Sequence, residues 1–152
     1  MRDLGRKPVG RLDEVEAMID EATRGWRAEG LGPFVLETAG PDPRVVGQAG
    51  LMVFDSRDWT PSTWDRAGAH AQPELGWSLI PAHRGRGYAT EAAAAIRDWA
   101  GGRSIGRLVS PISPDNVPSQ RLAERLGAVP AETVTPADTG RPTVVWRHRP
   151  GG

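Results

Sequence analysis

A glycine-rich turn between a strand pattern and a helix pattern constrains this chain more than any other feature. Residues 74–80 alternate as a strand that Pro81 ends, and residues 88–100 carry apolar side chains at helical spacing. The turn between them includes the run Arg-Gly-Arg-Gly at residues 84–87. Glycine permits a tight turn with exposed N–H groups, and a helix start adds unpaired N–H donors and the positive end of its dipole. The pattern therefore predicts a cradle for an anionic group, typically a phosphate.

Two common phosphate-binding motifs are disfavoured by the residues around this turn. A P-loop needs a Gly-Lys-Ser/Thr run, and the only lysine of the chain is Lys7. A dinucleotide fingerprint needs Gly or Ala where Thr90 stands, and an acidic residue about 20 positions further on. Residues 106–108 are instead Gly, Arg and Leu. A turn that uses glycine for its geometry alone is the alternative to a binding site.

Helix and strand patterns interleave along the rest of the chain, which predicts an α/β fold with a mixed sheet. Helical patterns cover residues 12–28, 88–100 and 116–126, and strand patterns cover residues 34–38, 45–54, 74–80, 107–112, 128–135 and 142–148. Residues 55–73 are predicted to be a long polar loop with Trp59 and Trp64, either mobile or lining an acceptor pocket or partner surface. The other four tryptophans lie on element faces and are predicted to be core: Trp26, Trp77, Trp99 and Trp146.

Composition excludes several functional classes. The 152 residues fit a single domain, and 19 basic against 19 acidic residues give no excess charge for binding nucleic acid. The absence of cysteine excludes disulfides, thiolate nucleophiles and cysteine zinc sites, and the three histidines lack metal-ligand spacing. No run approaches the ~18 apolar residues of a membrane span, and the first residues do not resemble a signal peptide. We therefore expect a cytoplasmic protein without a metal or a membrane partner.

Two motifs resemble those of the GNAT N-acetyltransferase superfamily. Residues 74–81 (Glu-Leu-Gly-Trp-Ser-Leu-Ile-Pro) followed by residues 84–92 (Arg-Gly-Arg-Gly-Tyr-Ala-Thr-Glu-Ala) look like its acetyl-CoA signature. The Gly-Tyr-Ala-Thr-Glu-Ala string and the run from Asn116 to Gly127 are similar to motifs of its ribosomal-protein N-terminal, RimJ/RimL-like branch. The resemblance spans about residues 10–148. It implies a mixed, mostly antiparallel sheet flanked by helices, in which strands 74–80 and 107–112 splay apart.

The resemblance also implies where acetyl-CoA, the co-substrate, binds. The main chain of Leu79 and Ile80 would hold the pantetheine arm, and the amides of residues 84–90 would hold the pyrophosphate. Asn116 would contact the pantetheine, and the outer phosphate would meet Arg86, Arg121 or Arg125. The binding residues expected on this basis are Leu79, Ile80, Arg84, Gly85, Arg86, Gly87, Tyr88, Ala89, Thr90, Asn116 and Arg121.

Two departures from the family pattern modify this expectation. The family begins with a further strand and helix, and this chain resembles the part that follows them. We expect a truncated start, a second subunit that completes the fold, or a degenerate member of the family; the second case makes a homodimer possible. In addition, Ala123 stands where many GNAT enzymes outside this branch have a tyrosine that protonates the leaving thiolate.

The expected reaction is acetyl transfer to a primary amine by direct attack, without a covalent enzyme intermediate. The acceptor would be a protein N-terminus or a small-molecule amine, because an α-amino group needs less help to lose its proton than a lysine does. Glu74 is the candidate base, acting through a water, and Ser119 the candidate donor to the thiolate. The alternatives are a solvated strand-start carboxylate and an ordinary first-turn helix serine. At the level of the protein, the alternative is a catalytically silent acyl-CoA-binding or dimerisation module.

Overall fold

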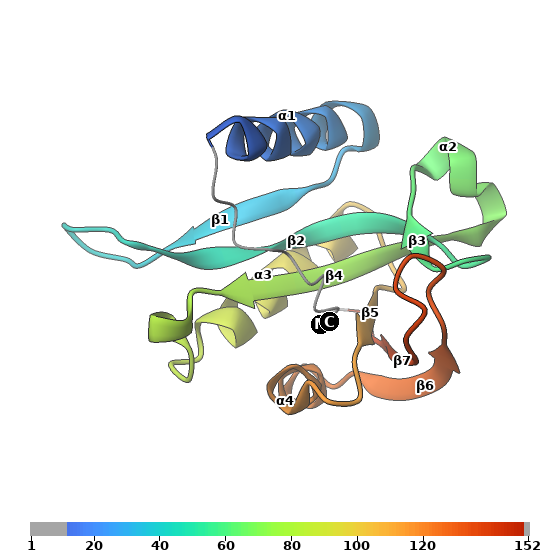
Figure 1. Cartoon of the computed structure of the whole chain (residues 1–152). Helices are drawn as coiled ribbons and strands as arrows, with labels where there is room; N and C mark the ends of the chain where they lie inside the picture. Colours follow the sequence, from blue (N-terminus) through green and yellow to red (C-terminus); the bar gives the residue numbers. More distant parts are fainter. Residues whose placement is uncertain (1–11, 151–152) are drawn as a thin grey trace.

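The protein is built on one sheet whose strands come from most of the chain (Figure 1). The structure is a computed structural model that describes residues 12–150, so Lys7 lies outside the described residues. The strands are β1 (Pro33–Glu37), β2 (Val45–Asp55), β3 (Thr60–Pro61), β4 (Ala71–Leu79), β5 (Val109–Ile112), β6 (Val129–Val134) and β7 (Thr143–Arg147). The helices are α1 (Leu12–Glu29), α2 (Trp64–Ala67), α3 (Tyr88–Gly102) and α4 (Val117–Arg125), with short 3₁₀ turns η1 (Gly68–His70) and η2 (Pro81–His83).

The sheet order is β1-β2-β4-β5-β7-β6, with β3 paired to β2. The β4–β5 pair is parallel and the other pairs are antiparallel. This confirms the expected mixed, mostly antiparallel sheet flanked by helices. Each long periodic segment predicted from the sequence forms its element within a few residues.

The central strands β4 and β5 diverge almost as soon as they meet. Their only ladder pair in the described chain is Glu74 with Val109, whereas β4 pairs with β2 along its whole length. One residue further on, Ser110 Oγ donates a hydrogen bond of 2.6 Å to the carbonyl of Leu75. Beyond this point no strand of residues 12–150 lies opposite β4 on that side. The expected splayed central pair is therefore confirmed, and we call this opening the fork.

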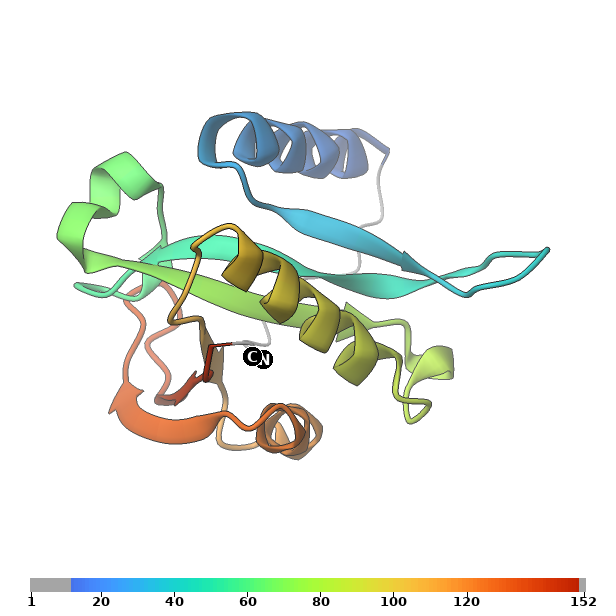
Figure 2. The same cartoon turned by 180° about the vertical axis from the view of Figure 1, so that it is seen from behind.

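The two faces of the sheet are packed by different clusters, because successive side chains of a strand point to opposite faces. Helix α3 lies over one face of the sheet (Figure 2). Leu75 and Trp77 belong with Ala93 and Ile96 of α3 to the larger core cluster. On the other face Phe54, Trp59, Val109 and Val145 form a second, smaller cluster. Glu74 alternates with Leu75 and so belongs to this second face.

The predicted long loop over residues 55–73 is wrong. The segment forms β3, α2, η1 and the start of β4, and Trp59 is buried in the second cluster. Trp64 donates its ring N–H to the carbonyl of Glu29 (3.1 Å) and its main-chain N–H to the Glu29 carboxylate (2.9 Å), which ties the segment to the end of α1.

Local polar bonds hold the first part of this segment in place. The side chain and main-chain N–H of Arg57 both donate to the Asp55 carboxylate and lower the pKa of Asp55 to about 2. The Thr63 side chain caps α2 by accepting from the N–H of Arg66. A segment ordered by such bonds shows no apolar periodicity and therefore reads as a loop.

Strand β4 begins three residues before the predicted start, because Pro73 does not interrupt it. The Ile80 N–H donates to the Val46 carbonyl on β2, whereas the Leu75 carbonyl accepts from Ser110 on the β5 side. Main-chain groups of alternate residues thus face opposite neighbours. Pro73 belongs to the set that faces away from β2, so its missing N–H removes no bond to that strand.

Helix α1 contacts the core only near its C-terminal end. Its Trp26 packs edge-to-face on Phe34 and Trp99, with ring centroids 4.9 and 5.8 Å apart. Leu12 and Ile19 on the predicted apolar face are 74% and 59% exposed. Within the described residues, no helix has the length and apolar character needed to cross a membrane.

Candidate active site

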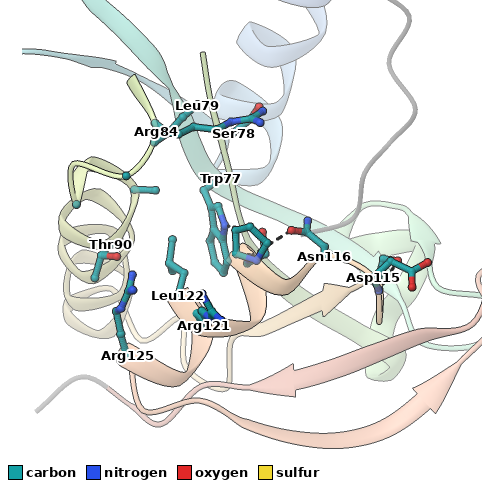
Figure 3. A pocket seen from close by; sticks show the side chains of 16 residues that line it. Trp77, Ser78, Leu79, Arg84, Thr90, Asp115, Asn116, Arg121, Leu122 and Arg125 are labelled. Carbon is teal, nitrogen blue, oxygen red and sulfur yellow. Dashed lines mark hydrogen bonds between the residues drawn. The ribbon is translucent and has the colours of Figure 1, made fainter. Parts of the chain in front are cut away.

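A cavity of about 710 Å³ lies where β4 ends, α3 begins and α4 crosses below (Figure 3). This volume is within the range of small-molecule sites. Nine predicted site residues line it: Leu79, Arg84, Gly85, Gly87, Ala89, Thr90, Asn116, Ser119 and Arg121. Four do not: Glu74, Ile80, Arg86 and Tyr88. Six other lining residues are not among those that the sequence predicts: Trp77, Ser78, Ser113, Asp115, Pro118 and Leu122.

The predicted anion cradle is open main chain. Gly85 and Gly87 have φ values of 76° and 81°, in the left-handed region that favours glycine. Gly87 is the N-cap of α3 and offers no side-chain cap to its first N–H groups. A Cβ placed at either glycine would meet no protein atom within 4 Å. The bend is thus not filled by side chains, and it fits a diphosphate that approaches the start of the helix.

The cavity wall carries an excess of positive charge. Arg84, Arg121 and Arg125 line it together with a single acidic residue, Asp115. Figure 3 shows Arg84 at the β4 end and the other two arginines on α4. Within the described part of the chain none of these three guanidinium groups forms an ion pair. Such a wall attracts a ligand with several negative charges.

The fork supplies unpaired main-chain groups beside the cradle. Since the Ile80 N–H is bonded to Val46 on β2 (2.8 Å), alternation turns the main-chain groups of Trp77 and Leu79 toward the fork. No strand lies opposite them in the described chain. An extended ligand arm can pair with β4 here as an added strand would. The residue positioned for such pairing is Leu79, and Ile80 lies outside the lining.

Ser119 lies at the inner wall of the cavity, in the first turn of α4. Its main-chain N–H donates to the side chain of Asn116, the N-cap of this helix, at 3.3 Å. Its hydroxyl accepts a hydrogen bond of 3.2 Å from the ring N–H of Trp77. Trp77 and Ser119 are both buried. The structure therefore brings the predicted hydroxyl donor and N-cap residue together, and it adds a tryptophan that had been interpreted only as core.

Glu74 is buried outside the cavity, on the opposite face of β4. Its carboxylate lies along the strand toward the fork, because a Cβ on Gly76 would come within 2.9 Å of Glu74 Oε1. Gly76 is in turn the ladder partner of Gly50 on β2. The main chain of Gly32 and Pro33 lies against Gly50, and the Glu74 carboxylate occupies the space that a side chain at position 76 would need.

A buried histidine and a buried serine are hydrogen-bonded at the point where β4 and β5 separate. Ser110 Oγ lies 2.7 Å from His148 Nε2 and also donates to the carbonyl of Leu75. Burial, together with the nearby charge of Arg97, lowers the pKa of His148 to about 4. The imidazole is therefore neutral near neutral pH. Among the described residues no group of three or more His, Cys, Asp or Glu could hold a metal ion.

Comparison with known proteins identifies the family. The model of the acetyltransferase (GNAT) domain matches residues 4–129. The chain belongs to this family. Its fold is also that of solved acetyltransferases of this family.

Individual relatives agree with this assignment. The chain is 33% identical over 142 residues to mycothiol acetyltransferase of Tsukamurella paurometabola, covering 88% of this chain but 41% of that protein. Among solved structures, an acetyltransferase from Agrobacterium tumefaciens is 29% identical, with a TM-score of 0.68 over 91% of this chain and 72% of its own. The microcin C7 self-immunity acetyltransferase MccE, solved with acetyl-CoA and AMP, has a TM-score of 0.71 at 14% identity, covering 93% of this chain and 73% of its own, and so shares the fold.

Proposed function

We propose that this protein transfers an acetyl group from acetyl-CoA to a primary amine by direct attack. The observation that carries the proposal is the open cradle at Gly85 and Gly87, which lies beside the fork on an arginine-rich cavity wall. A diphosphate joined to a long polar arm needs this pairing of an anion site with unpaired strand groups. Membership of the GNAT family supports acetyl-CoA as that ligand.

In this arrangement each part of the ligand has its own contacts. The main-chain N–H groups from Gly85 to Thr90 hold the pyrophosphate, since the N–H of Arg84 already donates to the Pro81 carbonyl. Arg86 and Tyr88 take part only through their main chain. Leu79 pairs with the pantetheine arm, and Asn116 contacts the same arm. Arg121 and Arg125, which line the cavity and form no ion pair with another described residue, meet the outer phosphate.

The transfer needs a neutral amine. Its nitrogen forms a bond to the thioester carbonyl carbon, the C–S bond breaks, and the proton that the amine loses ends on the sulfur of CoA. At pH 7, deprotonating an α-amino group with a pKa of ~7.8 requires about 1 kcal/mol, whereas deprotonating a lysine with a pKa of ~10.4 requires about 4.6 kcal/mol. A site with one carboxylate base therefore favours an acceptor of low pKa, such as a protein N-terminus or a small amine.

Glu74 and Ser119 have different roles in the transfer, Glu74 as the base and Ser119 as a hydrogen-bond donor. The Glu74 carboxylate, on the face opposite the cavity, takes the proton from the amine through a water, so that acceptor and acetyl donor approach from opposite sides of the sheet. Ser119 donates a hydrogen bond to the departing sulfur. This serine supplies the contact that a tyrosine at position 123 provides in other branches, which agrees with the RimJ/RimL-like motif in residues 87–92.

The decisive experiment measures CoA thiol release from acetyl-CoA with peptides that carry either a free α-amino group or an acetylated N-terminus and a lysine. We expect release with the free α-amino group, at least about tenfold faster at pH 7 than with lysine. Glu74→Gln should reduce that release most at low pH, where the amine most needs a base. Binding of CoA without release on any amine would favour a silent acyl-CoA-binding module, and failure to bind CoA would refute the proposal.

A further inference from the structure

The Trp77–Ser119 hydrogen bond joins the sheet to α4 at the inner wall of the cavity. It joins residues 42 positions apart in the chain, and its donor and acceptor are 5% and 6% exposed. Figure 3 shows Trp77 extending from β4 toward the helix that carries Asn116 and Leu122. A buried side-chain bond of this length in sequence fixes the orientation of both groups. Its presence inside the binding cavity calls for more than a packing role.

The chemistry of the pair fixes the direction of this bond. An indole N–H can donate but cannot accept, so Ser119 Oγ must be the acceptor. The hydroxyl proton is then directed away from Trp77. In the part of the chain that the structure describes, Ser119 Oγ has no other hydrogen bond. In particular, it does not donate to the carbonyl of Asp115 four residues earlier, which is the usual acceptor for a serine within a helix.

The main chain of Ser119 is held independently. Its N–H is bonded to Asn116, and Pro118 precedes it in the first turn of α4. Only rotation about the side-chain bonds remains to be set, and the bond from Trp77 sets it. Donation into the oxygen also makes the hydroxyl a better donor to a third group, because hydrogen bonds in a chain polarise one another.

We propose that Trp77 is a positioning residue that turns the Ser119 hydroxyl so that it donates a hydrogen bond to the sulfur of CoA. This inference rests on the proposed function, in which the thiolate departs beside Ser119. The hydroxyl stays intact throughout: as the C–S bond breaks, the electron pair goes to sulfur, Ser119 solvates the resulting thiolate, and the proton lost by the amine finally neutralises it. A phenylalanine at position 77 would keep an aromatic ring in the core but has no N–H to orient the serine.

The test uses CoA itself as the probe and needs no acceptor. The pKa of the thiol in the bound state is measured from the ultraviolet absorbance of the thiolate during a pH titration. A hydrogen bond to a charged group shifts such an equilibrium by about tenfold or more, so S119A should lower the thiolate fraction of bound CoA about tenfold at a given pH. W77F should lower it severalfold, and the double variant W77F/S119A no further than S119A alone. The same non-additive pattern is expected in kcat, with KM for acetyl-CoA nearly unchanged.

Two further variants keep the test independent of folding. W99F removes an indole from the same core but leaves the Ser119 bond in place, so the pKa of bound CoA should not move. Replacement of Trp77 by 3-benzothienylalanine keeps the bicyclic shape without the N–H and should reproduce W77F. Additive effects of W77F and S119A, or an unshifted pKa in the benzothienyl variant, would overturn the inference. Absence of CoA binding to the unaltered protein would instead refute the proposed function on which it rests.

Discussion

At the scale of single residues, His148 shows how one proton position follows from the bonds around it. Ser110 has one hydroxyl proton, which it donates to the carbonyl of Leu75, so it accepts from His148. The neutral imidazole therefore carries its proton on Nε2. Protonation of the other nitrogen would place a charge in a buried site near Arg97, which explains the lowered pKa of His148.

His148 should make the free energy of unfolding decrease as the pH is lowered from about 6.5 toward 4. The folded-state pKa of His148, about 4, lies below the ordinary value of about 6.5. Protons therefore bind the unfolded chain more tightly, and the stabilising contribution is complete above pH 6.5 and lost as the pH falls toward 4. Linkage gives a loss of about 2 kcal/mol at pH 5. Urea unfolding at pH 7 and pH 5 measures it, with His148→Gln as the comparison because glutamine keeps a donor for Ser110 without titrating. Equal losses in both proteins would contradict this account.

Residue roles were the part of the site that the sequence could predict least. Asn116 and Ser119 could be found because they stand at the start of a helix at recognisable spacing. Trp77 could not, since an indole on the apolar face of a strand looks the same whether it only packs or also donates a bond. His148 was one of three scattered histidines, and only the fold places it against Ser110.

At the scale of elements, the turn into α3 predicts a separable effect on binding. Gly87 has a positive φ and lines the cavity, whereas Gly140 has a φ of 61° in the turn between β6 and β7 and does not. Neither Cβ would meet another atom within 4 Å. Gly87→Ala and Gly140→Ala should each destabilise the fold by about 1 kcal/mol through backbone strain.

Only the first of these variants should affect CoA. A methyl group at position 87 lies where a diphosphate would approach the start of α3, so Gly87→Ala should weaken CoA binding at least about tenfold. Gly140→Ala should leave it unchanged. Calorimetric titration of CoA into the two variants makes the comparison. Equal affinities would show that the diphosphate is held elsewhere.

The same scale shows which elements the sequence could predict. Helix α3 and strand β2 carry long apolar periodicity and stand within a few residues of their predicted bounds. The segment from Asp55 to His70 is ordered instead by polar contacts such as the Arg57 pair and the Thr63 cap. Such bonds depend on geometry that no periodic pattern encodes. The positive φ of Trp59, which turns its ring into the second cluster, is of the same kind.

At the scale of the whole molecule, the fork divides the sheet into two parts that share one hydrophobic core. Strands β1 to β4 with α3 are joined to β5 to β7 with α4 by one ladder pair and by hydrogen bonds that include Ser110–Leu75, Trp77–Ser119 and the bond from Arg97 to the Leu126 carbonyl. The cavity is lined by both parts, from Trp77 to Thr90 on one side and from Ser113 to Arg125 on the other. A ligand seated there would contact both parts at once and so add to the links between them.

CoA should therefore stabilise the entire fold rather than one loop. At a concentration one hundred times its dissociation constant, a ligand that binds only the folded state adds about 2.7 kcal/mol to the free energy of unfolding. We expect CoA to raise the midpoint of thermal unfolding and to slow amide exchange in both β4 and β5, on the two sides of the fork. NAD and NADP at equal concentration are the controls, and they should have little effect because their recognition motif is missing. Protection confined to the start of α3, or equal protection by NADP, would mean that the ligand does not span the fork, since a bridging ligand must stabilise both of the parts it touches.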